Sequence, residues 1–120
     1  MNEASGASDA RTMSIYREYL RLIAAGRKTV EVRVGYPSMR RIAPGDRIRF
    51  VSGDEECLTR VTRVTEYPSF EAMLDHEDAA SIGADEHESR EELLAAIRDI
   101  YPPGKEALGV LAIAVEVVEG

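Results

Sequence analysis

The segment that most constrains the fold of this chain is an apolar stretch near its end, "VLAIAV", at residues 110–115. Successive residues of a strand point to opposite faces, so a strand of this composition needs cover on both faces. The stretch is far shorter than the roughly 20 residues that span a bilayer. We therefore expect a central strand of a sheet, covered on both sides, and no membrane-spanning segment.

Three further strands are expected upstream of it. Residues 29–34, "TVEVRV", alternate strictly, which places the valines on one face and the polar residues on the other. Residues 46–52, "DRIRFVS", predict a second strand, and residues 57–67, "CLTRVTRVTEY", predict a third. Between residues 58 and 64 the apolar spacing departs from a period of two, which indicates a β-bulge or a sharp bend.

Helices are expected between these strands. Residues 14–26 have apolar side chains at helical spacing and end in a glycine, a common C-terminal stop. Residues 70–76 predict a short helix, and the acidic residues 77–88 predict a loop. Residues 89–101 begin with a capping-box pattern, Ser followed three residues later by Glu, and are ended by Pro-Pro-Gly. The alternation of strands and helices predicts an α+β fold, a partly closed β-barrel with helices packed around it.

Length and composition favour one globular domain. The chain has 120 residues, of which 44% are hydrophobic and 31% charged, as in ordinary soluble proteins. We expect residues 1–13 to form a disordered polar tail and residues 14–120 to form the domain. No leader-like apolar segment is present at the start, and Cys57 is the single cysteine, so a cytoplasmic location is expected.

Charge is distributed unevenly along the chain. The net charge is −7, yet residues 11–65 contain 12 Lys or Arg and 6 Asp or Glu, a net of +6. Residues 66–120 contain 3 basic and 14 acidic residues, a net of −11. Two interpretations follow: the two portions pair with each other in the fold, or the basic portion carries an anion site. The net negative charge of the whole chain opposes non-specific binding of polyanions.

Three charged residues near the expected helix-to-strand junction form the main candidate site. Glu31 and Arg33 are two apart on a strand and therefore point to the same face, and Lys28 lies just before them. A lysine that is partly desolvated near another cation has a lowered pKa, which makes it a better base or nucleophile. Such residues on a strand also occur as a solvated face, so position alone leaves both interpretations open.

The segment "GRKTVEVRV" resembles the G-x-K-x-x-E-x-R signature of the ASCH domain, a member of the PUA-like superfamily. Gly26, Lys28, Glu31 and Arg33 occupy its four positions. The segments "APGDRIRF", "YPSF" and "IYPPGKEALGVLAIAVE" extend the resemblance over nearly the whole chain. The resemblance implies a PUA-like β-barrel, a cleft between barrel and helices that the signature residues line, and a role linked to RNA.

Small bacterial proteins of this kind include amidohydrolases that act on N4-acetylcytidine, and they are similar to this chain in size and layout. The resemblance to them implies that Lys28 and Glu86 are catalytic residues. In a hydrolase of this kind, Lys28 is expected to act as the base, with Glu31 or Glu86 as the proton-transfer group. Asp85 and Glu88 are alternatives to Glu86. The threonine of that enzyme set does not carry over, because Glu31 holds its position.

The other hypothesis is a binding module that takes up RNA or a modified nucleotide or nucleoside in the cleft. Lys28, Arg33, Arg40 and Arg41 are then expected to contact phosphate or ribose, and Tyr36 to stack on a base. The loop arginines serve equally well as partners for the acidic portion, and Tyr36 as a packing residue. No cofactor is expected, and no metal site, because His76 and His87 with their acidic neighbours lack recognisable ligand spacing.

Overall fold

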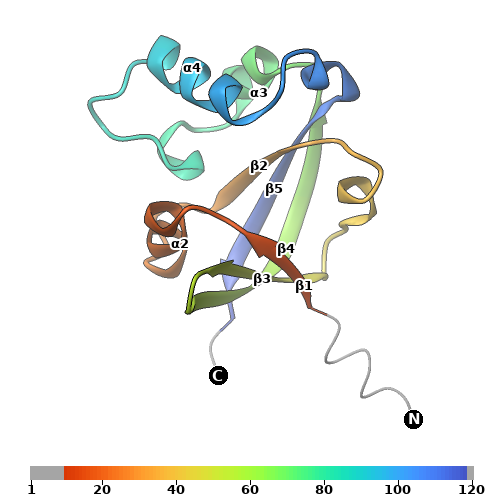
Figure 1. The fold of residues 1–120 in the computed structure, drawn as a ribbon, viewed down its shortest axis with the longest axis vertical. Coiled ribbons are helices and arrows are strands. Elements are labelled where there is room, and N and C mark those ends of the chain that lie inside the picture. The colour runs from red at the N-terminus through yellow and green to blue at the C-terminus, as the bar shows by residue number, and fades with distance from the viewer. Residues whose placement is uncertain (1–9, 119–120) are drawn as a thin grey trace.

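The computed structural model describes residues 10–118 and shows a five-stranded mixed sheet that curls into a half-barrel with helices around it (Figure 1). The strands are β1 (Arg11–Ser14), β2 (Val30–Val34), β3 (Arg47–Ser52), β4 (Glu55–Tyr67) and β5 (Val110–Val117). The α-helices are α2 (Arg17–Ala24), α3 (Phe70–His76) and α4 (Arg90–Ile100). Short 3-10 helices are η1 (Met39–Arg41), η2 (Ala80–Ile82) and η3 (Lys105–Leu108). This architecture confirms the expected α+β fold.

The sheet has the strand order β1-β3-β4-β5-β2, so the apolar strand β5 lies in its interior, as predicted. β1 pairs with β3 in parallel, and the other neighbours are antiparallel. The register of β4 against β5 shifts between Val61 and Arg63, which is the expected bulge. A bulge bends its strand and increases the local twist, so it helps to curl the long strand β4 around the barrel.

Strand β1 corrects one boundary drawn from the sequence. Residues 11–13 were expected in a disordered tail, but they form most of β1, with Met13 buried in the core. The hydrogen bonds that order this segment go to β3 and continue in the bond from the Ile15 amide to the Val51 carbonyl. Met13 is the only buried residue of this strand, so its sequence shows no alternation of apolar and polar residues from which a strand could be predicted. The rest of the expected tail, residues 1–9, lies outside the described residues.

The curled sheet separates two apolar cores. The first fills the barrel interior and is built around Ile48, Phe50, Val61 and Ile113. The second lies between the other face of the sheet and α3 with α4, and its members include Val30, Val34, Phe70, Met73, Leu93 and Ile97. Strand β2 therefore directs its valines into the second core, which sends Glu31 and Arg33 to the opposite face.

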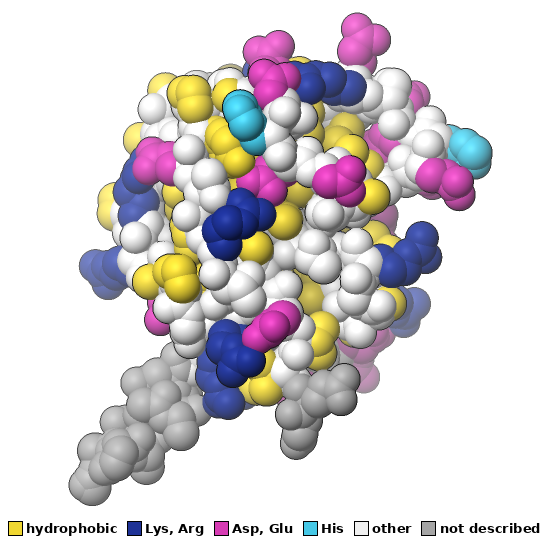
Figure 2. Space-filling view, turned by 180° about the vertical axis from the view of Figure 1, so that it is seen from behind, with side chains coloured by type: hydrophobic (Ala, Val, Ile, Leu, Met, Phe, Trp, Pro, Cys, Tyr) yellow, Lys and Arg dark blue, Asp and Glu magenta, His cyan; other side chains and the backbone are white. Residues whose placement is uncertain are grey.

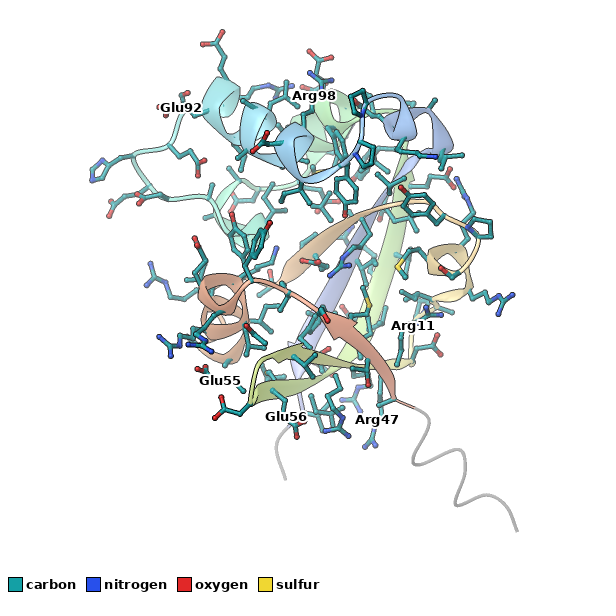
Figure 3. All side chains as sticks on the ribbon, viewed as in Figure 1. Arg11, Arg47, Glu55, Glu56, Glu92 and Arg98 are labelled. Carbon is teal, nitrogen blue, oxygen red and sulfur yellow. The ribbon has the colours of Figure 1, made fainter. Side chains whose placement is uncertain are left out.

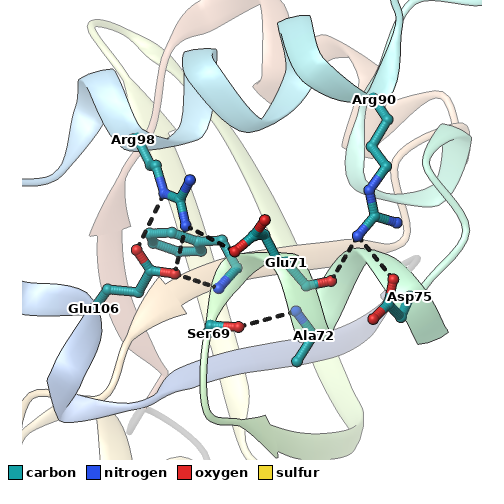
Figure 4. Close-up of polar contacts among 8 residues, drawn as sticks. Ser69, Glu71, Ala72, Asp75, Arg90, Arg98 and Glu106 are labelled. Carbon is teal, nitrogen blue, oxygen red and sulfur yellow. Dashed lines mark hydrogen bonds and ion pairs between the residues drawn. The ribbon is translucent and has the colours of Figure 1, made fainter.

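Helices α3 and α4 lie side by side at one end of the sheet and are joined by polar contacts (Figures 1 and 4). Glu106, from η3, accepts hydrogen bonds from the Arg98 side chain of α4 and from the Phe70 amide at the start of α3. Arg90 of α4 donates to Asp75 and to a backbone carbonyl of α3. The two helices and η3 are thus held as one unit over β2.

The basic and acidic portions of the chain pair with each other at the surface. Ion pairs that join residues 11–65 to residues 66–120 are Arg40–Glu66, Arg60–Glu116 and Arg63–Glu77. Figure 2 shows one face on which basic and acidic side chains are interspersed. In Figure 3, Arg47, Glu55 and Glu56 lie at the lower end of the sheet, where β3 and β4 meet. No helix of the described part of the chain is long and apolar enough to cross a membrane.

Candidate functional site

A cleft of about 330 Å³ lies along the free edge of β2, between the start of α2, the helix α4 and the end of η2. Most of its lining is apolar and comes from α4 and the segment before α2. Its polar side chains include all three members of the candidate cluster. The lining residues that matter below are Ser14, Tyr16, Tyr19, Lys28, Glu31, Val32, Arg33, Gly83, Ile100 and Tyr101.

Lys28 is held at the bottom of this cleft with its ammonium group fully engaged. The residue is 4% exposed. Its Nζ donates hydrogen bonds of 2.8 Å to the carbonyls of Val30 and Ile82, and it lies 3.3 Å from the Glu31 Oε1 atom. Burial lowers the pKa of the Lys28 ammonium below its ordinary value, while the neighbouring Glu31 carboxylate acts in the opposite direction.

Glu31 is clamped between two cations. Its Oε2 atom accepts a 2.6 Å hydrogen bond from Arg33 Nε, while its Oε1 faces Lys28. Arg33 also donates from Nη2 to the Ser14 carbonyl at 3.0 Å. This last bond joins β2 to β1, the two edge strands of the half-barrel. The cluster therefore closes the open side of the barrel and places one net positive charge in the cleft.

Local sequence explains how Lys28 reaches this position. Helix α2 stops because Gly26 adopts a positive φ of 77°, after which the Lys28 amide bonds back to the Leu22 carbonyl. On the other side, Gly83 packs directly against the lysine: a Cβ there would lie 3.3 Å from Lys28 Cδ and from the Tyr19 ring. A glycine at the end of η2 thus allows the Ile82 carbonyl to approach Nζ.

Tyrosines form the walls of the cleft. Tyr16 is 63% exposed at its rim, and the Tyr19 ring lies 5.5 Å from Lys28 Nζ. Tyr101, just after α4, donates its hydroxyl to the Val32 carbonyl at 3.0 Å. Burial raises the pKa of Tyr101 to about 12, with the Arg33 charge partly offsetting this effect. Ile100 is 49% exposed and lies on the rim of the cleft.

The raised pKa of Tyr101 predicts a specific alkaline sensitivity. Below pH 10 the phenol is neutral in both states; between pH 10 and about 12 only the unfolded chain loses its proton, so stability falls with rising pH. This loss amounts to about 2–3 kcal/mol. Tyr101→Phe is expected to cost about 1 kcal/mol at neutral pH and to lack that alkaline decline.

Urea unfolding from pH 8 to 11.5 measures both effects. Tyr16→Phe, which removes an exposed hydroxyl from the same cleft, is the matched control and is expected to follow the unmodified protein. Equal alkaline declines in Tyr101→Phe and in the unmodified protein would contradict the buried hydroxyl bond.

The structure brings Lys28, Glu31 and Arg33 together and leaves the other predicted catalytic residue apart. Glu86 is exposed and lines a separate hollow of about 260 Å³, together with Asp85 and Glu88. Gly83 lines both the cleft along β2 and this second hollow, whereas the acidic residues that follow it line the second hollow alone. The lysine and Glu31 form a polar cluster without a contribution from Glu86.

The loop residues that were predicted to contact RNA or a nucleotide, Tyr36, Arg40 and Arg41, lie beyond the other end of β2. Arg40 donates to the Gly35 and Leu108 carbonyls and to the Glu66 carboxylate, so it ties η1 to η3 and β4. Tyr36 packs against the second core, with Lys105 Nζ 5.9 Å from its ring centroid. Arg41 is exposed on η1. None of Tyr36, Arg40 and Arg41 lines the cleft along β2.

Sequence reasoning missed the residues that supply the cleft's aromatic walls and the second acceptor of Lys28. Tyr16 and Tyr19 are three apart near the start of a helix, a spacing that places them on one face and was a usable signal. No local pattern marks the Ile82 carbonyl, which belongs to a segment expected to be a polar loop. Within residues 10–118, no three His, Cys, Asp or Glu side chains are grouped as a metal ion would require.

A half-barrel with a charged cluster in a cleft between a sheet edge and helices is a PUA-like domain, a class often linked to RNA binding. The family model of the ASCH domain matches residues 13–119, so the chain belongs to the ASCH family. The family prediction from the Gly26-Lys28-Glu31-Arg33 signature is confirmed. No curated protein matches the chain.

Solved structures agree with this assignment. The crystal structure of a hypothetical protein, PH0355, is 33% identical, with a TM-score of 0.80, and the match covers 91% of this chain and 99% of that one. The solution structure of PF0455 from Pyrococcus furiosus is also 33% identical, with a TM-score of 0.75 and coverages of 92% and 99%. An ASCH domain from Lactobacillus crispatus is 16% identical, with a TM-score of 0.63 and coverages of 98% and 85%, and so shares the fold.

Proposed function

We propose that the cleft binds a nucleobase or nucleoside, either free or presented on a single-stranded RNA. The observation that carries this proposal is the Lys28–Glu31–Arg33 cluster, which is fixed at the bottom of an apolar cleft with tyrosine walls. The link between PUA-like folds and RNA supports the same ligand class. A volume of about 330 Å³ is at the small end of ligand sites, which suits a base or nucleoside.

The chemistry of the cleft suits a flat, polar-edged ligand. Aromatic rings such as those of Tyr16 and Tyr101 offer faces on which a base stacks. Lys28 uses its ammonium hydrogens within the protein, so it contributes a fixed charge rather than a free donor. Glu31 and Arg33 retain hydrogen-bonding capacity for a ligand. Recognition is therefore directed at the base more than at phosphate.

Binding measurements on a set of nucleosides and a short single-stranded RNA test the proposal. Arg33→Lys keeps the charge but loses the planar fork of donors, so we expect affinity to fall about 10- to 100-fold. The matched control is Arg49→Lys, because Arg49 lies on β3 and pairs with Glu56 away from the cleft. Calorimetry is expected to show little change for this control. Equal losses in the two variants, or no binding of any nucleoside, would contradict the proposal.

A second candidate function is hydrolysis of an acylated nucleoside such as N4-acetylcytidine, with Lys28 as base and Glu31 as proton-transfer group. It is supported by the lowered pKa of Lys28 and by its contact with Glu31 in the cleft. The position of Glu86 in another hollow does not support it. Release of acetate that disappears in Lys28→Met would favour the hydrolase; tight binding without turnover would favour the binding function.

A further inference from the structure

One wall of the cleft is a short segment with little buried surface. Residues 14–16, which we call the strap, connect β1 to α2 and line the cleft. The chain is anchored in the barrel core by Met13 before the strap and by Leu20 after it. Within the strap, Ser14 and Tyr16 are exposed and Ile15 is only partly buried. Segments with few buried apolar contacts open locally at a lower free energy than the whole fold, so the strap is a candidate moving part.

Few long-range hydrogen bonds hold the strap. On one side, the Ile15 amide donates to the Val51 carbonyl of β3 at 3.0 Å. On the other side, Arg33 Nη2 donates to the Ser14 carbonyl at 3.0 Å. Among the hydrogen bonds within residues 10–118, only the Arg33 bond joins the strap to β2, the strand across the barrel opening. Helix α2 adds no side-chain cap at Tyr16, so its start does not stiffen the strap.

The opposite wall of the cleft is fixed more firmly. Helix α4 buries Leu93 and Ile97 in the second core. Its Arg90 and Arg98 side chains pair with acidic residues of α3 and η3. Tyr101, just after the helix, bonds to a carbonyl of β2. An opening of the cleft is therefore expected at the strap rather than at α4.

Arg33 is well placed to control the strap because its guanidinium is itself held in position. Its Nε donates to Glu31 Oε2 at 2.6 Å, and Glu31 is 6% exposed and paired with Lys28. The planar fork then directs Nη2 toward the Ser14 carbonyl. The buried part of the cluster thus fixes one arm of the guanidinium, and the other arm reaches across the barrel opening.

We propose that Arg33 is a latch: its bond to Ser14 holds the strap against the cleft, and release of this bond lets the strap open as a local unit. Because the strap lines a cleft of about 330 Å³, its opening widens the cleft on the side of β1. The latch is then a positioning device that limits the size of guest that the closed cleft admits. The inference goes beyond the proposed function, because it does not depend on which guest enters.

Amide hydrogen exchange, resolved by residue with NMR, tests the latch on the protein alone. The Ile15 amide reports on the strap, because its bond to β3 breaks when the strap opens. The Val61 amide reports on the barrel, since it bonds to the Asp46 carbonyl and its residue is 1% exposed. In Arg33→Met, Ile15 exchange is expected to accelerate about 10- to 100-fold relative to Val61, the effect of losing a hydrogen bond from a charged donor.

Arg33→Met leaves the Lys28–Glu31 pair balanced, so the variant is expected to fold. Arg33→Gln, which keeps a polar group beside Glu31, is a second variant with the same expected result. The matched control is Arg21→Met. Arg21 lies on α2 and pairs with Glu55 at the β3–β4 hairpin, so it holds the neighbouring helix without touching the strap. Its Ile15 exchange is expected to stay within about twofold of the unmodified protein.

The outcomes are decisive in each case. Faster exchange of Ile15 than of Val61 in the Arg33 variants alone supports the latch. Unchanged Ile15 exchange overturns it, because the strap is then held without Arg33. Equal acceleration of Ile15 and Val61 also overturns it, since Arg33 then stabilises the barrel as a whole. The same acceleration of Ile15 in Arg21→Met overturns it as well, because the strap then moves with α2.

Discussion

Glu31→Ala is expected to destabilise the protein by about 3–5 kcal/mol, because it leaves a buried ammonium without its counter-charge. Lys28 is 4% exposed and Glu31 is 6% exposed, so water screens neither group. The substitution also leaves the Lys28 and Arg33 cations facing each other with no carboxylate between them. It is therefore expected to loosen the link between β2 and β1 as well. Urea unfolding at neutral pH measures the loss.

The matched control is Glu66→Ala. Glu66 is also paired with an arginine, Arg40, but its side chain is 50% exposed. Exposed pairs contribute little, so this variant is expected to unfold close to the unmodified protein. Lys28→Met combined with Glu31→Ala is expected to be at least as stable as Glu31→Ala alone, because the fully buried ammonium of Lys28 is removed and only the partly exposed Arg33 keeps an unpaired charge. Equal unfolding midpoints for Glu31→Ala and Glu66→Ala would show that the cluster is solvated.

Phe70→Ala is expected to cost about 3–5 kcal/mol, the usual loss for a buried phenylalanine, and to widen the cleft. The Phe70 side chain is 1% exposed, and its ring stacks on Tyr101 with 5.7 Å between centroids. Because Tyr101 is a wall of the cleft, a cavity at Phe70 removes the support of that wall. Ligand affinity is expected to fall together with stability.

The milder pair Phe70→Leu and Phe50→Leu separates these two consequences. Phe50 is fully buried in the barrel core and does not line the cleft. Both substitutions are expected to lower stability to a similar extent, and only Phe70→Leu is expected to weaken nucleoside binding. Unfolding and calorimetry on the same samples measure the two effects. If Phe50→Leu weakens binding equally, the cleft depends on global stability rather than on the Phe70–Tyr101 stack.

Local patterns were sufficient to predict most of the sheet and the helices. The alternation in residues 29–34, the bulge between residues 58 and 64, and the capping box of Ser89 and Glu92 all appear in the structure. Each of these signals involves a few neighbouring residues, and the backbone geometry that it predicts is formed by those same residues. The resemblance to the ASCH signature, rather than a local pattern, predicted that Lys28, Glu31 and Arg33 would line one cleft.

Other parts of the site depend on contacts between distant segments. The carbonyl of Ile82 that receives Lys28 is 54 positions away in the chain, and Tyr101 reaches the Val32 carbonyl across 69 positions. Glu86 was predicted to act beside Lys28, but after the turn at Gly83 its segment lines another hollow. Such outcomes depend on how α4 and η2 pack over the sheet, and no short pattern encodes that packing.

The amino-acid sequence by itself determined the kinds of element and their order, because hydrogen-bonding periodicity and capping are local properties. It also placed Glu31 and Arg33 on one face of β2. Only the tertiary structure decided that a cleft with tyrosine walls surrounds the cluster and that Tyr36, Arg40 and Arg41 lie elsewhere. The physical reason is that cleft walls and floor come from segments brought together by burial of the two cores, and burial is a property of the whole chain.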